Sequence, residues 1–290
     1  MSRKWVSTFV WLGRGWVVGG LVLLFAAPVL VGQVLPPTGS PLLPAAVQQG
    51  ADVISTFTLV GHGEGGRRKW EVQGETADLL SETVHLSPVK ATNFGKVDVH
   101  LTADQGDFNK LTRDVHLEGR VVATTSDGAR LTTRWMDWSQ EREMGTTTDW
   151  LKVTREGMEV TGQGGVGYPK LKRVRVERQV TVTLTDAAGK TVITADGPME
   201  VDYGRERARF WRGVLVRDAQ GTVQSDRLDV LLDPKTRQMK KAIFWGHVRI
   251  NHGGQMAHAN RAEYWQSEGH VRLGGHPKLL VVPEGDLVGP

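Results

Sequence analysis

The sequence contains no cysteine. This absence excludes disulfides, thiolate metal sites, cysteine nucleophiles and a lipidated N-terminal cysteine. A helical hydrophobic period is also missing after residue 50. Glycine, in contrast, is abundant at 35 of 290 residues, which is typical of many short strands joined by tight turns. The length allows one large domain or two ordinary ones.

A strong charge of one sign is lacking as well. The formal net charge is +4, but Arg3, Lys4 and Arg14 all precede the first acid, Asp52. Removing these three from the 36 basic residues leaves 33 against 32 acids, so the rest of the chain is nearly neutral. The net charge therefore gives no reason to expect a nucleic-acid partner.

The one long apolar run lies near the N-terminus. Residues 15–35, GWVVGGLVLLFAAPVLVGQVL, carry no charge and are about as long as a helix that crosses a bilayer. Cations precede this run and none follows it before Arg67, so residues 1–14 are expected in the cytoplasm. The Pro-rich residues 36–50 are expected to form an extended linker. A cleavable signal peptide is the alternative, although its best cleavage site, LPAAV, fits poorly.

The remainder of the chain is periodic on two scales. Apolar and polar residues alternate, as in residues 170–184 and 210–216, which predicts strands with one buried face. A longer unit of an apolar residue, any residue, a small residue and usually a polar one recurs every 29 to 34 residues. Its small positions are Gly74, Ala103, Thr133, Gly162, Ala195, Ser225 and Ala259.

Each copy supplies about two strands that cannot bury an apolar face alone, so stacked copies must share one continuous core. We therefore expect an all-β fold of about seven two-strand repeats, with antiparallel strands in a jelly roll or folded-over sheet.

The repeat also bears on the acids of LTADQGDF, residues 101–108, which could be an acid/base pair. Asp104 has counterparts at Asp196 and Asp226 in the same repeat position. The acids that follow recur as well, at Asp107, Asp137, Asp229 and Glu263. A catalytic site needs its acids once, so these acids are expected to be solvent-facing parts of the architecture.

Other chemistry-bearing patterns are weak. GQGGVGYP, residues 162–169, precedes an alternating strand rather than the helix that a nucleotide loop requires. The late histidines could in principle supply a zinc site, but they recur in strand phrases such as VHL and favour outward positions. The basic strand 170–178 is either a solvated face or a contact for an anionic headgroup. No catalytic residues, metal or cofactor are predicted, and the chain is not expected to be an enzyme.

The order of these features resembles a known family. The anchor and linker, followed by the phrases VHLEGRV, GARLTT and MEVTGQG, look like LptC, the membrane-anchored periplasmic component of lipopolysaccharide transport. The later phrases TADGPMEV and VQSDRLDVLLDPKTRQMKKAIFWGHV resemble the OstA-like domain of LptA, the soluble bridge protein. The resemblance implies an LptC-like β-jellyroll over 51–185, an LptA/OstA-like extension over 186–283 and a tail at 284–290.

The resemblance implies a scaffold in the inner membrane, with a single pass and the bulk of the chain in the periplasm. Its partners would be lipopolysaccharide, an inner-membrane ABC transporter for it, and an LptA-like bridge or outer-membrane LptD-like protein. Acyl chains would lie in an apolar groove, for which the inward candidates are Leu101, Ala103, Phe108, Leu131, Thr133, Trp138, Val160, Ile193, Ala195, Val223 and Val230. Edge strands would pair with partner proteins through Ile54, Phe57 and Leu59 at one end and Leu279 and Val281 at the other.

Two other classes remain open. A structural or adhesion protein built from extracytoplasmic β-repeats would share the strand pattern without carrying lipid. A parallel β-helix enzyme acting on polysaccharide would need shorter rungs and one unrepeated cluster of acids, and the sequence has no such cluster.

Overall fold

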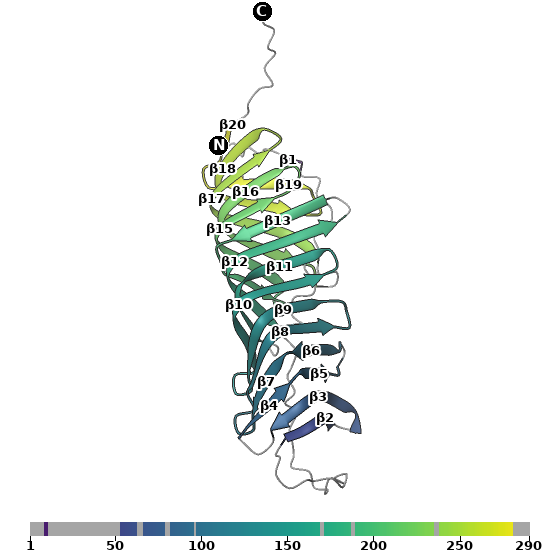
Figure 1. The fold of residues 1–290 in the computed structure, drawn as a ribbon. Helices are drawn as coiled ribbons and strands as arrows, with labels where there is room; N and C mark the ends of the chain where they lie inside the picture. Colours follow the sequence, from purple (N-terminus) through teal and green to yellow (C-terminus); the bar gives the residue numbers. More distant parts are fainter. Residues whose placement is uncertain are drawn as a thin grey trace, which may run out of the picture. The chain divides into compact units, whose positions relative to one another are not determined.

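The computed structural model describes residues 9–10, 53–62, 66–78, 82–95, 97–168, 171–186, 189–234 and 238–280 (Figure 1). No helix in this part of the chain is long and apolar enough to span a membrane. The predicted transmembrane helix 15–35, the linker 36–50 and the tail 284–290 lie outside it, as does the predicted cytoplasmic start apart from residues 9–10. The chain divides into two compact units.

The N-terminal unit comprises residues 20–156 and 163–175. Its strands are β2 (Val53–His62), β3 (Arg68–Asp78), β4 (Thr83–Ser87), β5 (Val89–Asn93), β6 (Val99–Ala103), β7 (Gln105–Asn109), β8 (Val115–Thr125), β9 (Arg130–Ser139), β10 (Met144–Arg155) and the greater part of β11 (Met158–Tyr168). The C-terminal unit comprises residues 1–19, 157–162 and 176–290. Its strands are β1 (Phe9–Val10), the greater part of β12 (Arg173–Asp186), β13 (Gly189–Ala195), β14 (Met199–Asp202), β15 (Arg207–Arg217), β16 (Gly221–Leu232), β17 (Met239–His252), β18 (Gln255–Trp265), β19 (His270–Gly274) and β20 (Lys278–Leu280).

The described strand pairs are antiparallel within both units, which confirms the predicted all-β antiparallel fold. β12 and β13 form a hairpin that pairs Asp186 with Gly189. β1 pairs with β19 through Phe9 and Val271.

Most strands have a corner near their middle, which is either a break or a β-bulge. β6 and β7 are separated at Asp104, and the register of β8 with β9 shifts between Glu118 and Val121. The two sides of the corners form separate ladders. In the N-terminal unit the first half-sheet contains β4, β7 and residues 115–118 and 135–139, and the second contains β5, β6 and residues 121–125 and 130–133.

The C-terminal unit repeats this plan. Its first half-sheet contains β14, residues 207–211 of β15, 227–232 of β16, 239–245 of β17, 261–265 of β18, and β19. Its second half-sheet contains β13, residues 214–217, 221–225, 248–252 and 255–259 of the same long strands, and β20.

The recurring aspartates hold the corners. The Asp104 N–H donates to the carbonyl oxygen of Gly119 at 2.9 Å, and Arg120 donates to its carboxylate at 2.8 Å. This hydrogen bond from Arg120 lowers the pKa of Asp104. Gly119 and Arg120 have φ angles of 72° and 43°, in the left-handed region that favours glycine. The acid is therefore architectural, as its repetition predicted.

An equivalent corner in the C-terminal unit uses Asp226. Its Oδ2 lies 2.7 Å from Nδ1 of His247. Gly246 and His247 both have left-handed φ angles, of 72° and 42° respectively. A Cβ atom added to Gly246 would collide with the Asp226 carboxylate, so only glycine fits there without a shift. The seven small repeat positions are all buried at or near these corners, in agreement with the predicted close approach of the two layers.

Candidate functional site

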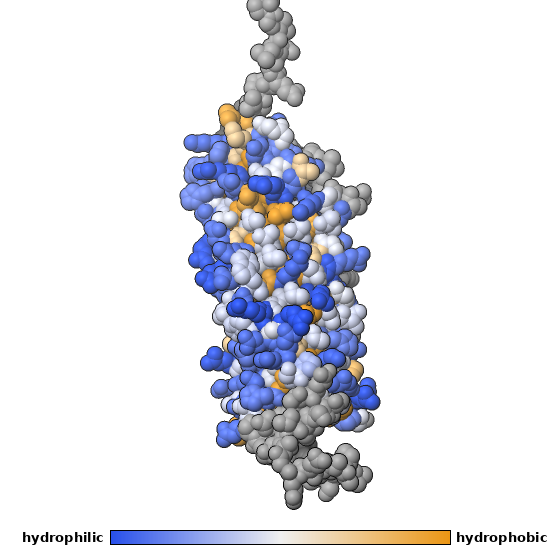
Figure 2. Space-filling model, viewed as in Figure 1, coloured by the Kyte–Doolittle hydropathy of each residue, from blue (hydrophilic) through white to orange (hydrophobic). Residues whose placement is uncertain are grey.

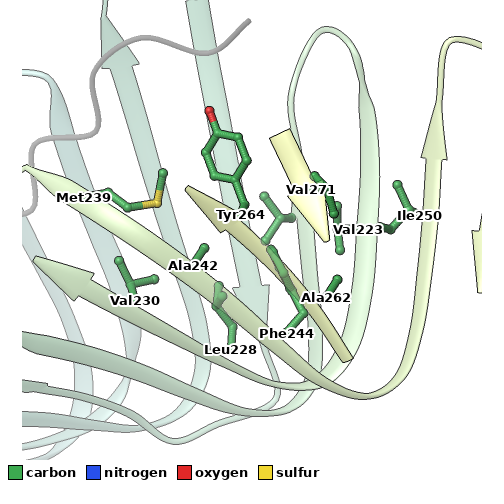
Figure 3. A pocket seen from close by; sticks show the side chains of 11 residues that line it. Val223, Leu228, Val230, Met239, Ala242, Phe244, Ile250, Ala262, Tyr264 and Val271 are labelled. Carbon is green, nitrogen blue, oxygen red and sulfur yellow. The ribbon is translucent and has the colours of Figure 1, made fainter. Parts of the chain in front are cut away.

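An apolar pocket lies between the two half-sheets of the C-terminal unit (Figure 3). Its cavity volume is only about 30 Å³, so the half-sheets would have to separate for a hydrocarbon chain to enter. Its lining residues are Val216, Val223, Leu228, Val230, Met239, Ala242, Phe244, Ile250, Ala262, Tyr264 and Val271. No lining side chain carries a formal charge, so the pocket suits a hydrocarbon ligand.

The hollow results from small and large side chains that alternate across the first half-sheet. Strand register places Val230 opposite Ala242, and Ala242 opposite Tyr264. In the next inward row Phe244 is opposite Ala262. An alanine between bulky neighbours leaves space that a larger aliphatic residue would fill, so these two rows produce the pocket.

Tyr264 supplies the one hydroxyl group of the lining. Its ring lies against the pocket (Figure 3), and the residue is 4% exposed. Burial raises the pKa of Tyr264, and the negative charge of Asp218 raises it further. The phenol therefore stays neutral, and the pocket keeps its apolar character across the physiological pH range.

The groove residues predicted from sequence are buried with one exception. Ten of them are buried: Leu101, Ala103, Leu131, Thr133, Trp138, Val160, Ile193, Ala195, Val223 and Val230. Phe108 is only half-buried. Val223 and Val230 line the pocket, whereas the other eight are buried elsewhere in the two units.

Several lining residues were missed by the sequence analysis, in particular Phe244, Tyr264 and Met239. They fall at alternate inward positions of strands β17 and β18. The alternation of inward and outward residues in AIFW and AEYW indicates these positions, but the prediction used only the repeat phrases. Which of these inward rows contains a void depends on cross-strand register.

The predicted solvent-facing position was wrong for Asp229, and the Glu263 side chain is also largely covered, at 13% exposed. Asp229 was expected to face solvent, but it is 1% exposed. Its carboxylate accepts hydrogen bonds from Arg207 and Arg227 at 2.5 and 2.6 Å, and from the Trp245 indole at 3.2 Å. Burial pushes the pKa of Asp229 upward, but the hydrogen bonds from Arg227 and Arg207 outweigh burial and lower it. Neighbouring long side chains cover the acid, which strand alternation cannot reveal.

The N-terminal unit carries a simpler ladder on the outer face of its first half-sheet. His85 lies 2.6 Å from Asp107, and His116 lies 2.6 Å from Asp137. These four residues are in register across β4, β7, β8 and β9, and their side chains are 43–61% exposed. Within the described ranges no group of three or more His, Cys, Asp or Glu side chains is placed to hold a metal ion.

The predicted edge strands are β2 in the N-terminal unit and β20 in the C-terminal unit. β2 pairs with β3, and β20 pairs with β18. Leu279 and Leu280 of β20 are 46% and 54% exposed, and Met256, opposite Leu280, is 40% exposed. Figure 2 shows apolar surface at the place where Figure 1 draws β20. Val281 lies outside the described residues, as do the side chains of Ile54, Phe57 and Leu59.

Comparison with known families agrees with the resemblance over part of the chain. Residues 66–185 match the family model described as lipopolysaccharide-assembly, LptC-related. This family is a non-enzymatic component of lipopolysaccharide transport in the cell envelope, in agreement with the prediction that the chain is not an enzyme. No curated protein matches the chain significantly.

Proposed function

We propose that this protein is a membrane-anchored periplasmic scaffold that carries lipopolysaccharide, with the acyl chains between its half-sheets. The observation that carries the proposal is the charge-free pocket of the C-terminal unit, in a chain whose residues 66–185 match the LptC-related model. The pocket lies outside the matched residues, so the proposal extends the cargo path into the C-terminal unit.

The physical requirement is the shelter of hydrocarbon from water. Burial stabilises a chain by about 0.8 kcal/mol per methylene group, so an acyl chain of about a dozen carbons gains on the order of 10 kcal/mol inside an apolar groove. The sugar headgroup would stay in water. Residues 15–35 would anchor the protein in the inner membrane.

The sheet edges would provide continuity between proteins. β2 would pair with an inner-membrane ABC transporter for lipopolysaccharide, which would supply the energy from ATP hydrolysis. β20, with its exposed Leu279 and Leu280, would pair with an LptA-like bridge or an outer-membrane LptD-like protein. Backbone hydrogen bonds along such edges allow one sheet to continue into the next.

A substitution that fills the pocket tests the proposal. Ala262→Phe places a ring in the pocket, opposite Phe244, and His258→Phe adds the same ring at an exposed position of the same strand. Full-length protein in detergent would be titrated with fluorescent lipopolysaccharide. We expect Ala262→Phe to weaken binding at least about tenfold by occupying the space for hydrocarbon, and His258→Phe to bind like the wild type.

Equal binding by the wild type and Ala262→Phe, with both folded by circular dichroism, would refute a lipid site in this unit. If Ala262→Phe does not fold, Ala242→Val is the smaller substitution for the same test, with the same expectation of weakened binding.

A further inference from the structure

The outer face of the first half-sheet in the C-terminal unit carries an array of basic and indole side chains. We call it the Arg/Trp plate, and it consists of Arg207, Arg209, Trp211, Arg227, Lys241, Trp245, Arg261, Trp265 and Arg272, together with the acids Glu200, Asp229 and Glu263. These residues alternate along their strands with inward residues such as Ala208 and Phe210, so the plate and the pocket lie on opposite faces of one half-sheet.

Cations lie over the indole rings throughout the plate. The Arg261 guanidinium is 4.3 Å from the Trp245 ring centre, and the Lys241 ammonium is 4.2 Å from that of Trp265. Arg209 lies 5.0 Å from the Trp211 ring. These contacts hold the cations and the indoles in fixed relative positions.

The acids of the plate lie beneath its cations. The Asp229 side chain is 1% exposed, against 37% for Arg227, which binds it. The Glu263 side chain is 13% exposed, against 41% for Arg261. The plate contains six cations and three acids, and Trp211 and Trp245 are partly exposed beside the cations that lie over their rings.

The ion pairs of the plate contribute little net stability, because the cost of burying charge offsets much of the attraction. They do fix the guanidinium groups in place before any partner arrives, which reduces the entropy lost on binding. A guanidinium held in this way can bind a carboxylate in bidentate geometry.

The spacing and the moderate charge indicate the class of partner. Trp211 and Trp245 share a register row and are separated by one strand, which places them about 10 Å apart. This distance suits a polymer whose flat, weakly polar units repeat at intervals of about two sugar rings. The acids neutralise half of the cations, whereas nucleic-acid surfaces carry a strong positive field.

We propose that the Arg/Trp plate binds an acidic polysaccharide, with sugar rings stacked on Trp211 and Trp245 and sugar carboxylates paired with exposed guanidinium groups such as that of Arg272. This proposal does not depend on the binding of lipid in the pocket, because it uses the opposite face of the half-sheet.

Binding to alginate oligosaccharides, a defined polyuronate, tests the proposal. Full-length protein in detergent would be titrated at low salt, with neutral dextran oligosaccharides, polyglutamate and oligo-dT as comparison ligands. Arg272→Gln removes an exposed cation 5.2 Å from the Trp265 ring, and Trp211→Leu removes one stacking surface. Trp150→Ala, at a 52% exposed tryptophan in the N-terminal unit, is the matched control.

We expect wild-type protein to bind alginate more tightly than each comparison ligand. Arg272→Gln and Trp211→Leu should each weaken the binding about three- to fivefold, and Trp150→Ala should leave it unchanged. No alginate binding by the wild type would overturn the proposal. It would also be overturned if polyglutamate or oligo-dT bound as tightly, or if Trp150→Ala caused an equal loss. Arg272 has a surface position, so its variant should fold even if Trp211→Leu does not.

Discussion

The two units bury their interiors in the same way and differ on the outer face of the first half-sheet. In the N-terminal unit this face carries the exposed His85–Asp107 and His116–Asp137 pairs. In the C-terminal unit it carries the Arg/Trp plate, in which Asp229 is almost fully buried beneath Arg207 and Arg227. Both sets of ion pairs connect neighbouring strands. The set in the N-terminal unit is exposed to solvent, whereas Asp229 in the C-terminal unit is covered by neighbouring side chains.

The difference separates what the fold requires from what it permits. Both units need small residues at the corners and apolar residues inside, because the half-sheets approach one another there. The outer face has only to be polar and paired, so it can differ between units. An outer-face feature found in one unit therefore points to a role separate from the architecture that both units share.

Truncation of the interior should have the largest effect and should be alike in both units. Leu131 is 0% exposed in the N-terminal unit and Leu228 is 1% exposed in the C-terminal unit. Substitution of either by alanine should lower the free energy of unfolding of its unit by about 3 kcal/mol, from lost burial and the cavity left behind. Hydrogen exchange read peptide by peptide would measure each unit separately. A loss confined to one unit's leucine would show that the interiors are not equivalent.

Loss of an outer-face acid should distinguish the units. Asp229→Ala should cost about 2–3 kcal/mol of unfolding free energy, because it leaves two guanidinium groups and the Trp245 N–H without their acceptor. Asp137→Ala removes one exposed partner of His116 and should cost less than about 1 kcal/mol. Denaturant titrations of the two variants would check the difference, and equal costs would contradict the contrast drawn between the two faces.

Corner glycines should behave alike in both units. Gly119→Ala and Gly246→Ala place a methyl group in the left-handed region and against Asp104 or Asp226, and each should cost about 2 kcal/mol. Gly253 also has positive φ, at 55°, but has open space around it, so Gly253→Ala should cost only about 1 kcal/mol. Thermal unfolding would rank the three variants. A cost for Gly253→Ala equal to the others would mean that the close approach to the acid contributes nothing.

Lowering the pH should have the smallest effect on the free energy of unfolding, and it should destabilise both units. The pKa values of Asp104 and Asp229 lie below the ordinary 3.8 in the folded protein. A carboxylate with a lowered folded pKa stabilises the fold above its unfolded pKa, and this contribution is lost as the pH falls through the folded value. Stability should therefore drop below about pH 3.8, and Asp229→Asn should flatten that drop.

Salt should weaken the ion pair of Asp104 more than the ion pairs of Asp229. At about 1 M NaCl the Debye length is about 3 Å, so the exposed Asp104–Arg120 pair should be screened while the covered Asp229 pairs are not. An acid-unfolding profile of the C-terminal unit as salt-sensitive as that of the N-terminal unit would contradict the burial of Asp229.

Much of this fold is predictable from sequence because alternation and repetition act locally. The small positions from Gly74 to Ala259 follow from spacing alone, and all are buried as expected. The pocket is different, since the void beside Ala242 and Ala262 arises from cross-strand register. Asp229 was assigned to the wrong environment for a similar reason, because long side chains from neighbouring strands cover it.

If one lipid path uses the interiors of both units, as proposed, photo-cross-linking in cells should detect it at inward positions of each unit. A photoreactive residue would replace Leu131 or Phe244, which face inward, or the outward residues Thr132 and Gln224 as controls outside the Arg/Trp plate. The account predicts lipopolysaccharide adducts at both inward positions, dependent on ATP hydrolysis by the transporter, and little at the outward ones. Absence of adducts at Leu131 and Phe244 in folded protein, or equal adducts on both faces, would contradict it.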